Sequence, residues 1–314
     1  MSRRRLPISL TLAAALTLGG GFVATVVLTA AVSRLEYGNK SLAFEQGAAV
    51  RAAALRQGMD EAAEVLNVTN QLFTTVQPVT RAQFHDFTTP LLQRHPYIRA
   101  FNFHRVVQAD ERAAFEADLR QFQPDLVLRE LRDGVRVTAP VRPRYHVVDY
   151  LEPMQGNEAA LGLNVSEYRQ MGDALARAQA SGRAAFTDLL RLAQAPGAPS
   201  FEVLMPVYAR GGRLLGDTAA VISIPTLVQA TLAHAGLQDD HCIKLRFYAG
   251  SHAEPSRLVY ASRDAAPIAP PAALLSAGYT GRVVDTFAVG GQSWTAEVIA
   301  MPAPWLTDHL ASTL

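Results

Sequence analysis

The N-terminal segment over residues 6–33 most constrains what this chain can become, because it contains no charged residue. As a helix, its roughly 28 residues would rise by about 42 Å, more than the ~30 Å of a bilayer's hydrocarbon core. Residues 3–5 are three arginines, and the positive-inside rule keeps such residues in the cytoplasm. We therefore expect residues 1–33 to form a cytoplasmic tip and one transmembrane helix in the cell inner membrane, with residues 34–314 in the periplasm. A cleaved signal peptide is the alternative, although its apolar region is usually about 7–15 residues long.

Composition excludes several classes of protein. Hydrophobic residues make up 49% of the chain and charged residues 18%, which excludes a disordered protein. Outside the arginines at 3–5 there are 26 basic against 28 acidic residues, so we expect no nucleic-acid partner. The single cysteine, Cys242, excludes an intrachain disulfide framework and a cysteine-rich zinc site. Two lysines against 27 arginines, with frequent alanine, are typical of a GC-rich bacterial genome.

A heptad pattern predicts a long helix over residues 34–77, which Pro78 ends because proline disfavours the helical conformation of the residue before it. Two interpretations stay open. The helix is a stalk that pairs with its twin in a homodimer, or it packs its stripe on its own globular part, and both can hold along one helix. The stripe recurs at alternating steps of four and three and comprises Ala48, Ala52, Leu55, Met59, Ala62, Leu66, Thr69, Phe73 and Val76.

The remaining chain alternates helix and strand signals. Thr80 and Gln83 predict a capping box for a short helix that stops before Pro96, and Gly182 predicts the end of a helix over 166–181. Such a mixture predicts an α+β fold with antiparallel hairpins, in one unit over 78–225 and a second over 226–304. Residues 305–314 are expected to begin a second membrane segment. Strands are expected near 98–107, 126–131, 145–151, 185–192, 201–208, 217–224, 242–248, 257–261, 282–288 and 293–300.

No standard catalytic motif is present. There is no nucleophile elbow, zinc-protease helix, P-loop or dinucleotide-binding glycine pattern, and no two of the eight histidines are three or four residues apart. We therefore expect no catalytic residue, no metal site and no cofactor. One membrane anchor and one large exported part fit a receptor's sensing half. They also fit an anchored periplasmic hydrolase with a site assembled from scattered residues, or a scaffold that dimerises through its stalk.

The stretch over residues 95–208 resembles the CHASE domain, an extracytoplasmic sensing module of bacterial and plant transmembrane receptors. The resemblance is an ordered series of short matches and covers about a third of the chain. The segments that carry it are residues 95–107, 111–115, 145–153, Asn157 with 161–164, 174–178, 181–182 with Thr187, and 201–208.

This resemblance implies two PAS-like units on a long N-terminal helix, with a small molecule bound in the membrane-distal one. In plant cytokinin receptors of the family a carboxylate after the central strand binds an adenine-like ring, and Glu152 occupies the similar position. Leu175 and Thr187 fall where the family lines its pocket. The chain departs from the plant pattern at Glu152 and Pro153, where those receptors carry Asp followed by Thr. The longer carboxylate and the rigid proline leave the ligand open.

The residues themselves add a physical argument. Glu152 ends an apolar strand, and a carboxylate buried there requires a donor from a ligand or from an arginine such as Arg142, Arg144 or Arg177. Tyr150 and Phe186 are further candidates for ligand contact, although aromatic residues in such positions more often belong to the core. Thr187 can equally satisfy a backbone group.

The sequence therefore predicts the sensory input module of a bacterial signal-transduction receptor. A ligand would shift the population of two arrangements of the distal unit, and the change would pass down the helix. In receptors of this family the cytoplasmic output domain is commonly a diguanylate cyclase or a histidine kinase, and no such domain is expected in these residues.

Overall fold

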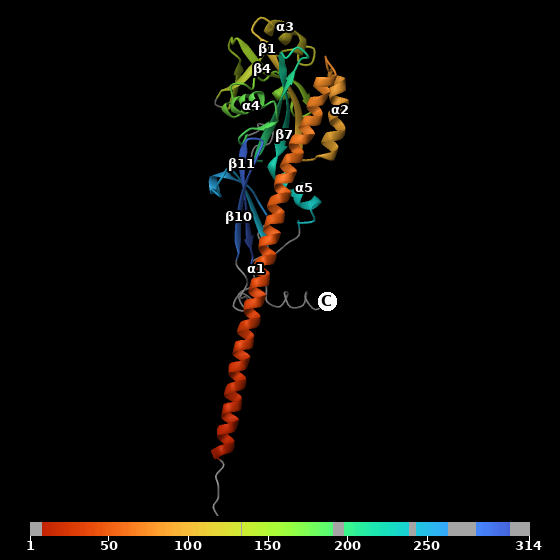
Figure 1. The fold of residues 1–314 in the computed structure, drawn as a ribbon. Coiled ribbons are helices and arrows are strands. Elements are labelled where there is room, and N and C mark those ends of the chain that lie inside the picture. Colours follow the sequence, from red (N-terminus) through yellow and green to blue (C-terminus); the bar gives the residue numbers. More distant parts are fainter. Residues whose placement is uncertain (1–7, 133, 191–197, 239–242, 263–280, 302–314) are drawn as a thin grey trace, which may run out of the picture.

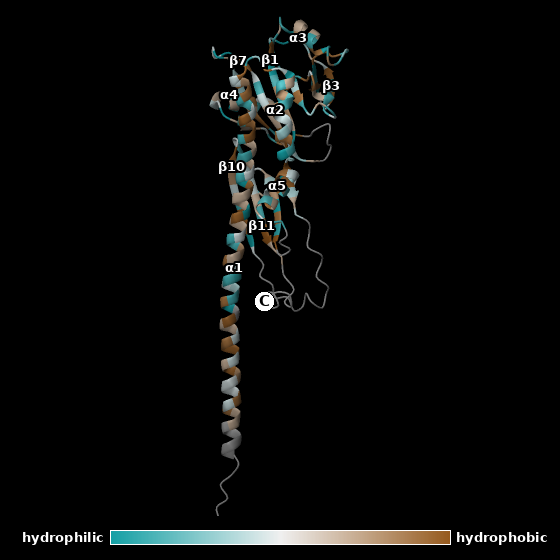
Figure 2. Cartoon of the chain, turned by 90° about the vertical axis from the view of Figure 1, so that its right-hand side faces the viewer, coloured by the Kyte–Doolittle hydropathy of each residue, from teal (hydrophilic) through white to brown (hydrophobic). Residues whose placement is uncertain are grey.

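A single helix extends far beyond the rest of the molecule. The structure is a computed structural model that describes residues 8–132, 134–190, 198–238, 243–262 and 281–301. Helix α1 (Ile8–Thr75) runs without a break, and its N-terminal part projects away from both sheets (Figure 1). All residues over 14–32 have exposed side chains, and Figure 2 shows little hydrophilic colour there. An exposed apolar helix of this length suits a bilayer, and in the described part of the chain this helix is long and apolar enough to cross one.

The heptad stripe of α1 is buried within the chain itself. Every member from Ala48 to Phe73 has its side chain covered, and Val76 is partly covered. The helix packs through this stripe on β6, β7, α5 and β10. Intramolecular packing therefore accounts for the whole stripe, its alanine-rich first half included. Helix α1 ends at Thr75, three residues before Pro78.

A five-stranded antiparallel sheet packs beside the C-terminal part of α1, away from the N-terminus (Figure 1). Its strand order is β4-β1-β7-β6-β5. Helices α1 and α2 (Arg81–Arg94) cover one face, and α4 (Arg169–Ser181) covers the other (Figure 1). The strands are β1 (Ile98–Gln108), β4 (Arg144–Glu152), β5 (Ala185–Phe186), β6 (Ser200–Tyr208) and β7 (Leu214–Ser223).

Alternation along the strands divides the side chains between these two faces. Phe103 stacks on Phe73 of α1, with ring centroids 4.3 Å apart. Val148 belongs instead to the hydrophobic cluster that contains Met171 of α4. The predicted capping box is confirmed, because Thr80 caps α2 and Gln83 completes the box. The predicted end of α4 is also confirmed, since Gly182 has a left-handed φ of 65°.

A smaller region lies at the end of the molecule remote from the N-terminus. It contains α3 (Arg112–Leu119) and a two-stranded hairpin of β2 (Arg129–Arg132) and β3 (Val135–Thr138). A short 3-10 helix, η1 (Glu158–Ala160), follows β4. Strand β3 and the helix η1 were not predicted from the sequence, and β5 is shorter than the strand predicted over 185–192.

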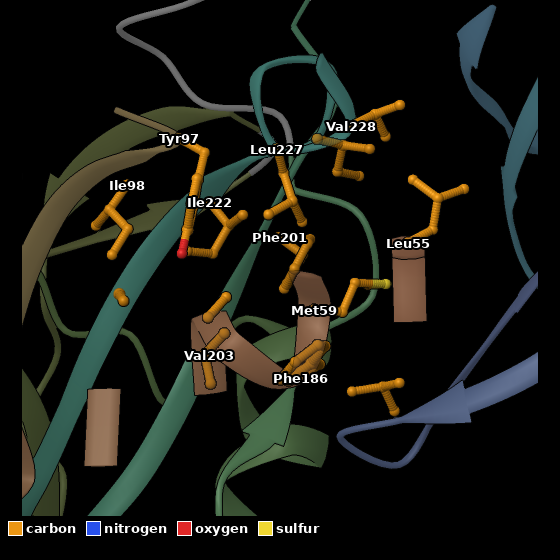
Figure 3. Close-up of a cluster of buried hydrophobic side chains, with 14 of the residues drawn as sticks. Leu55, Met59, Tyr97, Ile98, Phe186, Phe201, Val203, Ile222, Leu227 and Val228 are labelled. Carbon is orange, nitrogen blue, oxygen red and sulfur yellow. The ribbon is translucent and has the colours of Figure 1, made fainter. Parts of the chain in front are cut away.

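A second antiparallel sheet lies beside the middle of α1, with strand order β10-β11-β8-β9. Leu55 and Met59 of α1 pack in one buried cluster with Phe186, Phe201 and Val228 (Figure 3). The elements of this part are α5 (Ile224–His234), β8 (Ile243–Ala249), η2 (Pro255–Arg257), β9 (Leu258–Ala261), β10 (Arg282–Val289) and β11 (Gln292–Ala300).

Mixed helices and antiparallel sheets confirm the predicted α+β fold. The strands of the first sheet all precede residue 225 in the sequence, and those of the second sheet all follow it. The unit boundaries 78–225 and 226–304 stay a prediction. The predicted membrane segment at 305–314 lies outside the described residues.

Candidate functional site

A cavity of about 330 Å³ lies above the α4 face of the five-stranded sheet, within the usual range for a small-molecule site. Its walls are mainly apolar. They come from the sheet, from α4 and from the segments that lead into that helix. The apolar lining consists of Ala100, Leu131, Val148, Leu151, Ala159, Ala160, Leu163, Val165, Met171, Leu190 and Val221.

Three buried polar side chains lie at the floor of this cavity. Asn102 of β1 donates through Nδ2 to Oε1 of Glu202 on β6, at 3.1 Å. Strand β7 runs between them, and Ala219 is the β7 residue paired with Asn102. Glu202 is paired with Val221 of the same strand, so the amide and the carboxylate meet diagonally across β7. His104 completes the group, with Nε2 3.6 Å from the same carboxylate oxygen.

Several polar atoms at the floor have no hydrogen-bond partner among the described residues. They are Oδ1 of Asn102 and both ring nitrogens of His104. Buried polar atoms in folded proteins are almost always paired, because an unpaired one costs about 1–3 kcal/mol. The floor therefore offers hydrogen-bonding capacity that the described chain leaves unused.

Burial controls the charge of the floor. Loss of solvent raises the pKa of Glu202 to about 7, although the Asn102 hydrogen bond acts in the opposite direction. Burial lowers the pKa of His104 to about 3, and His146 adds to this effect. At neutral pH the imidazole of His104 is thus uncharged, and the carboxyl group of Glu202 is close to its titration midpoint.

The rim carries positive charge. Arg99 of β1 and Arg136 of β3 line the cavity and are exposed, and the guanidinium group of neither forms a hydrogen bond or an ion pair with the described residues. Tyr168 also lines the cavity. Burial raises its pKa to about 12, Arg136 lowers it and Glu202 raises it, so both charges act on this hydroxyl.

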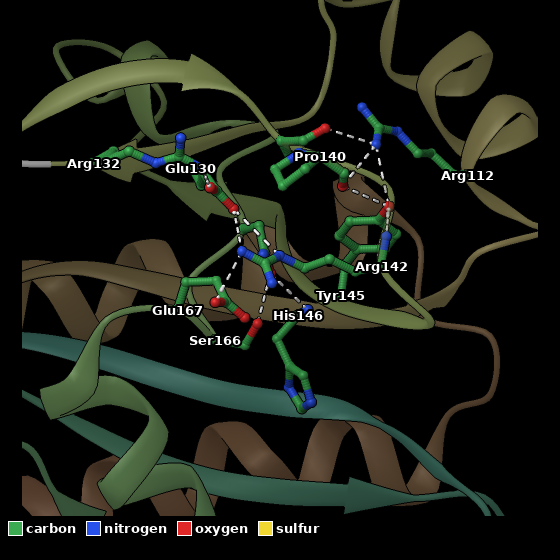
Figure 4. A network of polar contacts seen from close by, with 11 residues as sticks. Arg112, Glu130, Arg132, Pro140, Arg142, Tyr145, His146, Ser166 and Glu167 are labelled. Carbon is green, nitrogen blue, oxygen red and sulfur yellow. Dashed lines mark hydrogen bonds and ion pairs between the residues drawn. The ribbon is translucent and has the colours of Figure 1, made fainter.

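A polar network holds the β2–β3 hairpin in place beside the rim (Figure 4). Arg142 lies 3.1 Å from Oε2 of Glu130 on β2 and 2.9 Å from Oε2 of Glu167, which precedes α4. Arg132 approaches the other oxygen of Glu130 at 3.0 Å. Because Glu130 is buried, this pairing ties the hairpin that carries Arg136 to the segment before α4.

The five residues predicted from the sequence lie outside this cavity. Tyr150 and Glu152 alternate with Leu151 on β4, so Leu151 lines the cavity while the other two face α2. The Tyr150 hydroxyl donates to the carbonyl of Val79 at 2.7 Å. Glu152 is half-buried and lies 3.0 Å from Nδ1 of His85, so its partner is a histidine of α2 instead of the arginines considered above.

The other three candidates have structural contacts. Phe186 stacks on Phe201 with ring centroids 4.9 Å apart. Leu175 is buried in the α4 cluster and borders a separate hollow on the surface. Thr187 accepts a hydrogen bond through Oγ1 from the backbone N–H of Glu202, at 2.9 Å, and so braces the strand beneath the floor. A ligand role for these five residues stays a prediction, and their observed contacts are with the protein.

Asn102, His104 and Glu202 were not among the site residues predicted from the sequence. A usable signal was present, since Asn102 and His104 share the inward face of an otherwise apolar strand and Glu202 interrupts another. Polar residues on the buried face of a strand require partners. The described residues contain no group of three or more His, Cys, Asp and Glu side chains that could hold a metal ion.

Comparison with known proteins gives one family. A family model described as the CHASE domain matches residues 77–260, which confirms the resemblance read from the sequence. No curated protein matches the chain.

Solved structures of low identity also resemble it. One is an extracellular ligand-binding receptor from Desulfohalobium retbaense, with 10% identity, a TM-score of 0.49, and coverage of 82% of this chain and 40% of that one. This chain thus spans less than half of that receptor's length. Another is a methyl-accepting chemotaxis protein, with 16% identity, a TM-score of 0.46 and coverage of 84% and 99%. A third is the ligand-binding domain of the Pseudomonas aeruginosa amino-acid chemoreceptor PctC in complex with GABA, with 13% identity, a TM-score of 0.43 and coverage of 83% and 99%.

Proposed function

The chain belongs to the CHASE domain family, and from this premise we propose that it is the extracytoplasmic sensory half of a bacterial receptor that binds a small molecule in the cavity above the five-stranded sheet. The family is sensory and its domain is not itself catalytic. The observation that supports the cavity is its floor, where Asn102, His104 and Glu202 are buried and partly unpaired. A hydrolase is less well supported, because the polar groups of the cavity include no assembled nucleophile and base.

The proposed topology is a single pass through the inner membrane. The arginines at 3–5 stay in the cytoplasm, α1 crosses the bilayer with its exposed apolar part, and both sheets lie in the periplasm. The two sheets correspond to the proposed PAS-like units over 78–225 and 226–304. Any diguanylate cyclase or histidine kinase activity belongs to an output domain outside these residues.

The sheet provides a route from the cavity to α1. Glu202 lies on β6, and β6 and β7 pack on α1 from the opposite face. A ligand that binds one arrangement of these strands more tightly shifts the population toward it. The shift then moves the helix that continues into the membrane.

We also propose that two copies pair through α1, using a face of this helix other than the heptad stripe. The stripe is already covered by the chain, while Leu35, Leu42, Val50 and Val68 are exposed apolar residues of the same helix. Disulfide crosslinking tests this face. In a Cys242→Ser background, Leu42→Cys should crosslink two copies in membranes, while the buried Leu55→Cys should not. Absence of crosslinks at Leu35, Leu42 and Val50 contradicts the dimer.

A thermal-shift screen tests the cavity. The full chain in detergent or nanodiscs is mixed with amino acids, purines, short fatty acids and amines. A ligand at a hundred times its dissociation constant stabilises the folded state by about 2.7 kcal/mol. Each stabilising compound is then tested on Ala160→Trp, which fills the cavity from its half-buried edge, and on Ala180→Trp, an exposed position of α4.

We expect the stabilisation to disappear in Ala160→Trp and to persist in Ala180→Trp. Circular dichroism shows whether both variants are folded. Stabilisation that survives in a folded Ala160→Trp protein places the binding site elsewhere and contradicts the proposal.

A further inference from the structure

The floor and the rim of the cavity differ in their polar groups, and Asn157 and Tyr168 also line it. At the floor, the carboxyl group of Glu202 and the unpaired Oδ1 of Asn102 are hydrogen-bond acceptors. At the rim, Arg99 and Arg136 are donors with no acceptor among the described residues. The walls between them are apolar, with Val148, Leu163 and Met171 among the lining residues. A complementary ligand supplies donors at one end, an anion at the other and apolar atoms between.

We infer that the cavity binds an amino carboxylate, a molecule with an ammonium group at one end, a carboxylate at the other and an apolar spacer between them. The inference rests on the proposed function and specifies the ligand class of the same cavity. The ammonium group donates to Glu202 and Asn102. The carboxylate accepts from Arg99 and Arg136, and the spacer contacts the apolar walls.

The floor selects for a cation. A carboxylate placed there would face the buried carboxyl group of Glu202, and an apolar group would leave that carboxyl with Asn102 as its one hydrogen-bond donor among the described side chains. An ammonium group carries three donors and no acceptor. Two of them match Glu202 and Asn102, and a ring nitrogen of the uncharged His104 can accept the third. Each member of the floor then gains a partner that the described chain does not supply.

The rim selects for an anion. Guanidinium groups match the geometry of a carboxylate, with two parallel N–H donors for its two oxygens. The hairpin that carries Arg136 is fixed by the contacts of Glu130 with Arg142, so this cation is presented from an anchored element.

Isothermal titration calorimetry with matched compounds tests this inference on the full chain in nanodiscs. The probes are ω-amino carboxylates of four to eight carbons, with hexylamine and hexanoate as relatives of 6-aminohexanoate that each lack one charged group. Each relative lacks the hydrogen bonds of one charged group, and such bonds increase binding affinity substantially. We therefore expect the best amino carboxylate to bind at least about tenfold more tightly than hexylamine or hexanoate.

Four variants assign each end of the ligand. Glu202→Gln should weaken 6-aminohexanoate and hexylamine by about tenfold and leave hexanoate unchanged. Combined Arg99→Gln and Arg136→Gln should weaken 6-aminohexanoate and hexanoate and leave hexylamine unchanged. The matched controls are Arg183→Gln and Asp173→Asn, two exposed charged residues outside both the cavity and the Glu130 network, and both should bind like the wild type.

The outcomes separate the inference from the proposed function. Equal binding of hexylamine, hexanoate and 6-aminohexanoate overturns the inference, and so does binding by none of the amino carboxylates. If hexylamine or hexanoate binds the wild type and binds Ala160→Trp more weakly, the cavity is a site for another class of ligand and the proposed function stands. If the amino carboxylates bind Ala160→Trp as tightly as the wild type, both fail.

Discussion

The side-chain amide of Asn70 on α1 donates a hydrogen bond of 3.0 Å to the hydroxyl of Thr218 on β7. The same amide nitrogen lies 3.1 Å from the carbonyl oxygen of Pro206 and 3.3 Å from that of Met205, both on β6. One buried side chain of the long helix is thus bonded to two central strands of the cavity sheet. Glu202 lies on one of these strands, so Asn70 connects the helix directly to the backbone that carries the cavity floor.

Replacing Asn70 by leucine should destabilise the protein. The change removes a buried donor shared by the Pro206 carbonyl and the Thr218 hydroxyl, at a cost of about 1–3 kcal/mol, while the hydrogen bond from Thr218 to the carbonyl of Met205 is retained. Chemical denaturation of the full chain in detergent measures the loss. Asn67→Ala is the control, since Asn67 contacts only Glu64 of its own helix in the described structure, through a hydrogen bond of 3.4 Å. Equal stability of Asn70→Leu and Asn67→Ala contradicts the proposed connection.

Glu202 and His104 should oppose each other in the pH dependence of stability. Glu202 has its pKa raised by burial to about 7, so the folded protein holds a proton that the unfolded chain has lost above about pH 4.5. This term lowers the free energy of unfolding as pH rises. His104 has its pKa lowered by burial to about 3, so the unfolded chain binds a proton below about pH 6.5 that the folded protein lacks. This second term raises the free energy of unfolding as pH rises.

The two terms cancel between about pH 4.5 and 6.5, and single variants should expose them. Relative to the wild type, Glu202→Gln should gain stability with rising pH by about 1 kcal/mol per pH unit, and His104→Gln should lose stability by a similar amount. Denaturation at several pH values in this window measures the differences. In the double variant both terms are absent, so its free energy of unfolding should again follow the same pH dependence as that of the wild type. If the free energy of unfolding of Glu202→Gln changes with pH in the same way as that of the wild type, the pKa of Glu202 is not raised and the prediction is wrong.

Glu152 should control the titration of His85. The hydrogen bond to Glu152 raises the pKa of His85, the charge of the same carboxylate adds to the shift, and Asp86 contributes least. Glu152→Gln should therefore bring the pKa of His85 back toward 6.5, while Asp86→Asn should change it little. Proton NMR of the His85 ring follows both. An unchanged titration in Glu152→Gln means that the two side chains do not meet in solution.

Gly290 should be sensitive to substitution for two separate reasons. Its φ of 61° is left-handed, and a Cβ atom there would overlap the ring of Phe186. Gly212 has a similar φ of 79° with open space around it, so it isolates the backbone effect. We expect Gly212→Ala to cost about 1–2 kcal/mol and Gly290→Ala to cost about 1–3 kcal/mol more. Thermal unfolding compares them, and equal losses show that Phe186 yields without cost.

Local signals in the sequence predicted most elements of this fold correctly. Thr80 with Gln83 marked the start of α2, and Gly182 marked the end of α4, because caps depend on residues a few positions apart. The heptad stripe was ambiguous for a physical reason. The same spacing buries a helix against a twin or against its own domain, and the periodicity alone does not distinguish the two.

The cavity could not be read from the sequence because it depends on strand order. Asn102 and Glu202 are a hundred residues apart, and they meet diagonally across β7, which lies between β1 and β6. The family resemblance directed attention to Glu152 instead. A strand alternates its faces, so the step from Leu151 to Glu152 moves from the cavity to α2, where His85 is the partner.

Because α1 is unbroken, the length of this helix constrains how the sensor can be fused to the membrane segment of another receptor. The helix connects Ile8 to the sheet contacts near Asn70 without a hinge. Each residue added between the membrane and those contacts would turn the sensor by about 100° and lift it by about 1.5 Å. Chimeras that exchange the sensor along this helix should therefore signal in steps of whole turns. Insertion of seven residues nearly restores the angular phase, whereas two residues would point the cavity to the opposite side.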